Sequence, residues 1–276
     1  MAIVVECVGG AGVGKSYVAE ALVAELRTRS MPACLAMEPV GPRTTRARRV
    51  SRKSALALAE GVRSPGASLR MARAVAASGQ QGSRDALAIT LNWLTLRALV
   101  RRCRESPGLH VFDQAALMNL WSTGLHGDAG PCRAVLEDPE WSWVLPDAVL
   151  RVEATHELNL VQLQARGQRQ SRLEALADAE LRSALERATA DVASLVGWWG
   201  DAPADAGSRP VVHITNPGDA RLAEAMPGVA THLLALHTSH AADRSQMIAN
   251  APVSSRTPGG DRRSPPLPVR VPRKDR

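Results

Sequence analysis

A glycine-rich octapeptide, "GGAGVGKS" at residues 9–16, directly follows the apolar run "AIVVECV". It matches the pattern G-x-x-x-x-G-K-[ST] with Gly9, Gly14, Lys15 and Ser16, although the chain has 34 Lys and Arg residues of which only three are lysine. A plain glycine-rich turn is the alternative, but a strand before the loop and a helix after it favour a phosphate-binding loop. The residues expected to contact a bound nucleotide are Gly9, Gly10, Ala11, Gly12, Val13, Gly14, Lys15, Ser16 and Tyr17.

The rest of the chain alternates between strands and helices. The apolar runs predict strands at Ile3–Val8, Ala33–Met37, Leu109–Phe112, Ala148–Val152 and Val211–Thr215. Helical periodicity covers Ser16–Arg29, Ser54–Val62, Ala67–Ala77, Ser83–Glu105, most of Thr155–Trp198, and Asp219–Ala225. Such alternation predicts an α/β protein with a five-stranded parallel sheet flanked by helices. With the glycine-rich loop after the first strand, the expected fold is the three-layer fold of P-loop NTPases. Ligands of such sheets bind at the carboxyl ends of the strands.

Two acidic residues follow predicted strands. Asp113 ends "LHVFD", and an acid there can hold Mg²⁺ opposite the Ser16 hydroxyl, although it could instead cap the next helix. We favour the metal role, which makes Ser16 and Asp113 the predicted metal ligands. Glu38 in "MEPVG" could accept a hydrogen bond from a sugar hydroxyl, a base edge or metal-bound water. An exposed loop acid is an equally weighted alternative for Glu38.

Basic and amide residues suggest further contacts. "LQARGQRQSR" at 163–172 clusters Arg166 and Arg169 around one glycine, as in a loop that neutralises charge on a moving phosphate, or in a solvated helix junction. For the basic run 43–53 we favour a solvated loop over a phosphate-contacting segment. "ITNPGD" places Asn216 in a loop that we expect to pack near a purine base without selecting guanine.

Composition limits the other classes of function. Of the net charge of +7, +5 lies in residues 238–276, a Pro- and Arg-rich tail that we expect to be disordered beyond a nucleotide-binding domain of residues 1–237. The near-neutral domain argues against nucleic acid as a partner. No apolar run reaches membrane-spanning length and no basic leader precedes the first strand, so we expect a cytoplasmic protein without a membrane segment. The scattered cysteines Cys7, Cys34, Cys103 and Cys132 are expected to be free thiols.

Together these segments resemble the P-loop kinases of nucleosides and nucleoside monophosphates, especially thymidylate kinase and the deoxynucleoside kinases. "GGAGVGKSYVAEALVAEL" is similar to their phosphate loop and first helix, "MEPVG" to their Glu-Pro element, and "PDAVLRVEATHELNLVQLQARGQR" to the strand and helix before their arginine lid. The resemblance covers residues 2–226 and implies a helical lid insertion. It implies that Lys15 holds the transferring phosphate and that Glu38 lies on the side of the site that binds the acceptor. It also implies that Arg166 and Arg169 contribute positive charge from the lid.

Two positions depart from that family. Arg usually follows the strand-three acid, where this chain has Gln114, and Gln162 stands near the place of another Arg. Arg43, Arg46 or Arg48 could supply the missing charge, and we expect Arg43 and Arg46 to contact the substrate. The leading hypothesis is an ATP- and Mg²⁺-dependent kinase of a nucleoside, nucleotide or similar small molecule. The alternative is a P-loop ATPase or nucleotide-dependent switch; a homodimer is left open.

Overall fold

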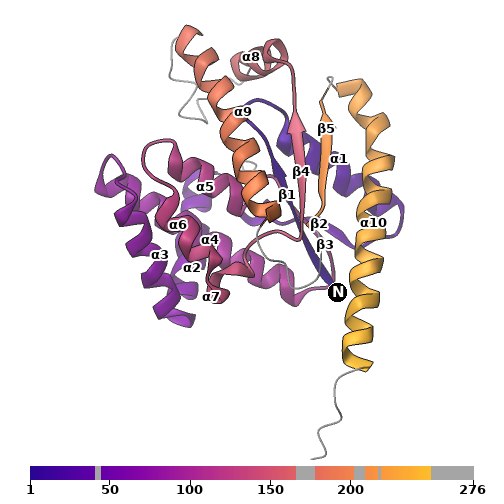
Figure 1. Ribbon diagram of the computed structural model, residues 1–276, viewed down its shortest axis with the longest axis horizontal. Coiled ribbons are helices and arrows are strands. Elements are labelled where there is room, and N and C mark those ends of the chain that lie inside the picture. The colour runs from indigo at the N-terminus through magenta and orange to yellow at the C-terminus, as the bar shows by residue number, and fades with distance from the viewer. Residues whose placement is uncertain (41–44, 166–177, 202–208, 217–218, 250–276) are drawn as a thin grey trace, which may run out of the picture.

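The five predicted strands form one sheet in which every strand is parallel to its neighbours. The computed structural model describes residues 1–40, 45–165, 178–201, 209–216 and 219–249. The strands are β1 (Ala2–Val8), β2 (Ala33–Leu35), β3 (Gly108–Phe112), β4 (Ala148–Glu153) and β5 (Val211–Thr215). Their order is β2-β3-β1-β4-β5, so β1 is central and pairs with β3 and β4 (Figure 1). The predicted parallel sheet is confirmed.

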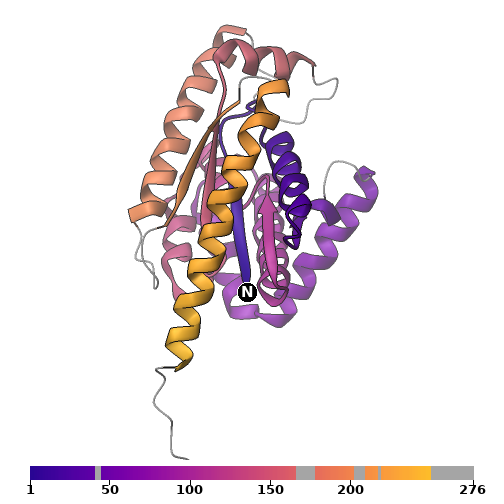
Figure 2. The same cartoon turned by 90° about the vertical axis from the view of Figure 1, so that its right-hand side faces the viewer.

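Helices cover both faces of this sheet. In chain order they are α1 (Lys15–Thr28), the 3₁₀ turn η1 (Glu38–Val40), α2 (Arg46–Arg63), α3 (Pro65–Ala77), α4 (Ser83–Glu105), α5 (Ala116–Gly124), α6 (Gly130–Glu137), α7 (Pro139–Ser142), α8 (His156–Ala165), α9 (Asp178–Asp201) and α10 (Asp219–Ala249). The helices α1 and α10 lie side by side on one face, and Figure 2 shows α10 running along the sheet. The helices α4, α5 and α9 cover the other face.

The central strand alternates its side chains between two cores. Ile3, Val5 and Cys7 pack with α1 and α10, whereas Val4 and Val8 pack with the helices of the opposite face. This two-residue alternation along a fully buried strand is what a parallel sheet covered on both sides requires. The structure is therefore the predicted three-layer α/β sandwich.

The start of α2 differs from the boundary that the sequence predicts. The basic run is not a loop followed by a helix from Ser54, because α2 already begins at Arg46, where the Thr45 hydroxyl accepts the N–H of Arg48 at its N-terminus. The helix can begin there because the Arg48 side chain remains exposed to water while later residues of α2, such as Leu56, are buried. Residues 41–44 before it lie outside the described residues.

The last helix is much longer than expected. The proposed domain boundary at residue 238 falls inside α10, which runs through Pro227 to Ala249. A proline inside a helix removes one backbone N–H. The Pro227 carbonyl accepts hydrogen bonds from the Thr231 hydroxyl and from Arg29, the residue after α1. Apolar residues after Pro227, among them Leu233, are buried in the core between α10 and the sheet. The remainder of the predicted tail, residues 250–276, lies outside the described residues.

The segment between β3 and β4 is more helical than the sequence patterns indicate. It contains α5, α6 and α7, which supply several of the largest buried side chains, including Trp141. None of the described helices combines the length and the apolar composition that crossing a membrane requires. All four cysteines are free, as expected.

Candidate functional site

The glycine loop lies at the carboxyl end of the central strand, where α1 begins. Gly14 is the residue before α1 and has a φ of 87°, a left-handed conformation that favours glycine. A Cβ at this position would also lie 2.5 Å from the side-chain nitrogen of Asn216. At Gly9 a Cβ would clash with the carbonyl oxygen of Val152 in β4. Gly9 and Gly14 are therefore required by close packing as well as by the motif.

Lys15 points back over the loop that precedes it. Its ammonium donates to the carbonyl oxygens of Gly9 at 2.9 Å and Gly10 at 2.7 Å. The side chain thus lies beside the backbone N–H groups at the N-terminus of α1, a position that favours anions. This placement agrees with a role in binding phosphate.

Ser16 and Asp113 meet across two adjacent strands. The Ser16 hydroxyl donates to Oδ2 of Asp113 at 2.7 Å, although the two residues are 97 positions apart. A hydroxyl and a carboxylate are oxygen ligands of the kind that Mg²⁺ prefers, with phosphate oxygens and water completing its octahedron. Among the described residues there is no cluster of three or more His, Cys, Asp or Glu side chains that could hold a metal by itself. The donor set therefore fits Mg²⁺ bound together with a nucleotide.

Asn216 packs beneath the loop. Its side chain is buried, its amide nitrogen donates to the carbonyl of Val13 at 2.9 Å, and its backbone N–H donates to Glu153 at 2.7 Å. The structure therefore gives Asn216 a positioning contact with the loop, while a contact with a purine base stays a prediction. Tyr17, also predicted to bind the cofactor, is 45% exposed at the start of α1.

The helix α8 contacts the same loop. Leu163 of α8 is buried in a small cluster with α9, and Ala11 of the loop packs against that cluster. Gln162 lies close to Gly14. The segment that should carry the arginine lid therefore begins directly at the loop. Arg166 and Arg169 themselves fall at positions outside the described residues.

The residues predicted to contact the acceptor are described only in part. Glu38 is exposed in η1, after a strand β2 that ends at Leu35 and not at Met37 as expected. Arg46 is the first residue of α2, and its side chain is not described. Arg43 lies outside the described residues. The substrate contacts assigned to Glu38, Arg43 and Arg46 stay predictions.

Sequence reasoning missed Glu6, an acidic residue in the middle of β1. Its side chain is fully buried and accepts the backbone N–H groups of Ala115 at 2.8 Å, Leu117 at 3.0 Å and Met118 at 2.9 Å. These groups are at the N-terminus of α5, so one carboxyl group caps that helix. Since Asp113 lies just before α5, Glu6 fixes the segment that carries the carboxylate predicted to bind metal. The signal was a lone acidic residue in an apolar strand.

The environment of Glu6 predicts an unusual dependence of stability on pH. Burial raises the pKa of Glu6 from 4.5 to about 7, although its hydrogen bonds with α5 act in the opposite direction. Between these two pH values the folded protein binds a proton that the unfolded chain has released. The contribution of Glu6 to stability is therefore largest below pH 4.5 and declines as the pH rises to 7.

This dependence is measured by comparison with Glu6→Gln, which cannot titrate. Denaturant unfolding of both proteins at a series of pH values from about 5 to 8 gives the difference between their unfolding free energies. We expect the advantage of the native protein over Glu6→Gln to shrink as the pH rises. A difference that stays constant or grows would contradict the raised pKa.

A cavity of about 120 Å³ lies beside the predicted metal site. Gln114, the neighbour of Asp113, lines it together with Lys53 of α2 and Asn92 of α4. Lys53 is a second residue that sequence reasoning missed, because it was grouped with the basic run. A second cavity, of about 180 Å³, lies between Gly9, Gly10 and the residues at the end of β4.

No protein-family model and no curated protein matches this chain. Among solved structures, shikimate kinase from Bacteroides thetaiotaomicron is 11% identical with a TM-score of 0.44, over 85% of this chain and 99% of that chain. Deoxyadenosine kinase from M. mycoides with bound dATP is 10% identical with a TM-score of 0.46, over 84% of this chain and 99% of that chain. Similarity at this level gives no information about the substrate of this protein.

The class of the protein follows from its own geometry. An all-parallel sheet has the glycine loop and its lysine after the central strand β1, and an aspartate after the adjacent strand β3. This is the predicted P-loop NTPase arrangement, and the predicted fold class is confirmed. The predicted arginine lid, residues 163–172, lies outside the described residues from residue 166 on.

Proposed function

We propose that the protein is an ATP- and Mg²⁺-dependent phosphotransferase that acts on a small-molecule acceptor. The observation that supports this most directly is the hydrogen bond of 2.7 Å between Ser16 and Asp113, one residue away from Lys15. It brings a hydroxyl, a carboxylate and an ammonium to the end of one sheet, beside a helix N-terminus. These are the groups that a site for Mg²⁺ and a triphosphate needs.

In this proposal each group of the chain has a defined task. The backbone N–H groups of the loop bind the phosphates, and Lys15 exchanges the carbonyls of Gly9 and Gly10 for phosphate oxygens. Ser16 and Asp113 would hold Mg²⁺, which neutralises charge on the phosphates when it is bound. Asn216 and Glu6 act at a distance, by fixing the loop and the Asp113 segment.

The reaction transfers one phosphoryl group. An acceptor hydroxyl oxygen forms a bond to the terminal phosphorus of ATP, the bond from that phosphorus to the bridging oxygen breaks, and ADP leaves with that oxygen. The hydroxyl proton passes to water. Arg43, Arg46, Arg166 and Arg169 are the proposed sources of positive charge around the moving phosphate, with Glu38 on the acceptor side.

The experiment is an acceptor screen with the full-length protein. ADP formation is measured with Mg·ATP alone and after addition of nucleosides, nucleoside monophosphates, sugars and sugar acids. We expect at least one acceptor to raise ADP formation in proportion to the amount added. Slow ADP formation at one rate in every reaction would instead indicate the alternative, an ATPase or a nucleotide-dependent switch.

A further inference from the structure

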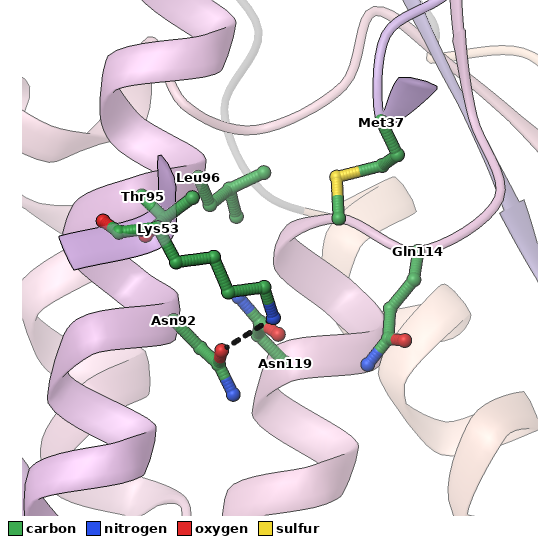
Figure 3. Close-up of a pocket in the computed structure, with 7 residues that line it drawn as sticks. All are labelled: Met37, Lys53, Asn92, Thr95, Leu96, Gln114 and Asn119. Atoms are coloured by element: carbon green, nitrogen blue, oxygen red, sulfur yellow. Dashed lines mark hydrogen bonds between the residues drawn. The ribbon is translucent and has the colours of Figure 1, made fainter. Parts of the chain in front are cut away.

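The cavity beside Gln114 is lined mainly by polar side chains from four separate segments. Lys53 comes from α2, Asn92 and Thr95 from α4, Asn119 from α5, and Gln114 from the turn after β3. Figure 3 shows the ammonium of Lys53 between Asn92 and Asn119, with Gln114 and Met37 across the cavity. The cavity therefore has a cation on one side and amides around it.

The charge of Lys53 is not matched by a carboxylate. Its ammonium donates to Oδ1 of Asn92 at 3.0 Å, and no acidic side chain among the described residues lies within ion-pair distance of it. Elsewhere in α2 the opposite holds, because the buried Glu60 pairs with Arg97 at 2.8 Å and with Arg101 at 2.6 Å. Burial and the nearby Arg49 lower the pKa of Lys53. A partly desolvated ammonium in this situation attracts an anion.

The side-chain amides of Gln114 and Asn119 are available to bind a ligand. Among residues that the structure describes, the side-chain amides of Gln114 and Asn119 have no hydrogen-bond partner. Thr95 differs, because its hydroxyl donates to the backbone carbonyl of Lys53 at 3.1 Å. Gln114 and Asn119 can each donate two N–H groups to an oxygen of a ligand.

The position of the cavity links it to the proposed reaction. Gln114 directly follows Asp113, which is bonded to Ser16 at the phosphate loop. At about 120 Å³ the cavity holds a compact group, since a cavity of about 150 Å³ accommodates benzene. The lining residues include no aromatic side chain on which a base could stack. These features favour a small charged group over a nucleobase.

We infer that this cavity binds an oxyanion group, a carboxylate or a phosphate, of the molecule that accepts the phosphoryl group. The ammonium of Lys53 is its charge partner, and the amides of Asn119 and Gln114 are its hydrogen-bond donors. The inference rests on the proposed function, because the loop must hold ATP for this neighbouring cavity to face an acceptor. It also gives the chain a cation close to the position where the resembling kinases have arginine.

The experiment compares charged and neutral forms of the same molecule. Calorimetric titrations use the full-length protein saturated with Mg²⁺ and a non-hydrolysable ATP analogue, so that the phosphate loop is filled. The probes are ribose with ribose 5-phosphate, glucose with glucuronate, and deoxyadenosine with deoxyadenosine monophosphate. We expect the charged member of at least one pair to bind about 10- to 100-fold more tightly, the range for a charge-assisted hydrogen bond. The sugar pairs distinguish a phosphate from a carboxylate.

Two variants assign this preference to Lys53. Lys53→Met removes the charge at similar length, and Asn92→Asp places a carboxylate at the atom that lies 3.0 Å from the ammonium. Both variants should reduce the preference for the charged probe to about 3-fold or less. In Asn92→Asp the new carboxylate would do so by forming an ion pair with Lys53. The control Arg63→Met removes an exposed cation from the end of the same helix and should keep the preference. The variants should bind the ATP analogue as tightly as the native protein does.

The possible outcomes separate the two proposals. Equal binding of charged and neutral probes, binding of none of them, or a preference that survives both cavity variants would overturn the oxyanion site. In those cases binding of the ATP analogue would still support the proposed function. Failure of the ATP analogue itself to bind would overturn the proposed function and the oxyanion site with it.

Discussion

Lys15→Ala is expected to abolish measurable binding of Mg·ATP while leaving the protein folded. The lysine is the proposed cation of the phosphate loop. Removing charge-assisted hydrogen bonds to two phosphates lowers affinity by about 100-fold or more. Its own contacts in the structure are with the carbonyls of Gly9 and Gly10. Their loss should cost only about 1 kcal/mol of stability, because water can reach these half-buried groups. Calorimetric titration and thermal unfolding measure the two effects.

The matched control is Arg63→Met, which removes one positive charge from the C-terminal end of α2. It should leave the affinity for Mg·ATP within about 2-fold of the native value, because an exposed cation outside the loop is largely screened by salt. Native affinity in Lys15→Ala would show that the loop does not use its lysine for phosphate. A collapse of the fold in Lys15→Ala would show that the lysine is structural.

Asp113→Asn is expected to lower acceptor-dependent turnover by about 100-fold or more. The amide keeps the shape of the side chain and can still accept from Ser16, whose hydroxyl now lies 2.7 Å from Oδ2. It removes the negative charge that would hold Mg²⁺, and a catalytic metal contributes several kcal/mol to the transition state. Initial rates over a range of Mg²⁺ concentrations measure the effect, together with ATP affinity in the absence of Mg²⁺.

A companion variant tests whether the two residues act as one metal site. Ser16→Ala removes the other proposed ligand, and the double variant should be little worse than the more impaired single variant. ATP affinity without Mg²⁺ should barely change in Asp113→Asn, because the loop remains intact. Native Mg²⁺ dependence in Asp113→Asn would exclude Asp113 as a metal ligand.

The strands and the loop could be predicted because their patterns are local. The apolar runs and the glycine motif each lie within a few residues, and the parallel order then brings Ser16 and Asp113 together at one edge. The helices between residues 116 and 142 were missed because they are short, between four and nine residues, and have glycines and prolines at their ends. The length of α10 was missed because Pro227 predicts a helix end. The burial of Leu233 beyond it and the contact of Pro227 with Arg29 are long-range features that no local pattern shows.

The missed site residues have partners that no local pattern reveals. Glu6 lies 109 residues from Ala115, whose N–H it accepts, and Lys53 lies 39 residues from Asn92. In the sequence Glu6 is one letter in an apolar strand, and Lys53 is the end of a basic run. Their roles follow from the packing of α5 on β1 and of α2 on α4, which only the three-dimensional arrangement defines.

The destination of the terminal phosphate of ATP tests the central claim most directly. The native protein is incubated with Mg·ATP labelled at the terminal phosphorus and with the acceptor found in the screen, and the labelled products are separated. The proposed phosphotransferase predicts that the label appears in the acceptor in an amount equal to the ADP formed, and that Asp113→Asn loses this transfer. Label found only in inorganic phosphate, at the same rate with and without the acceptor, would contradict it.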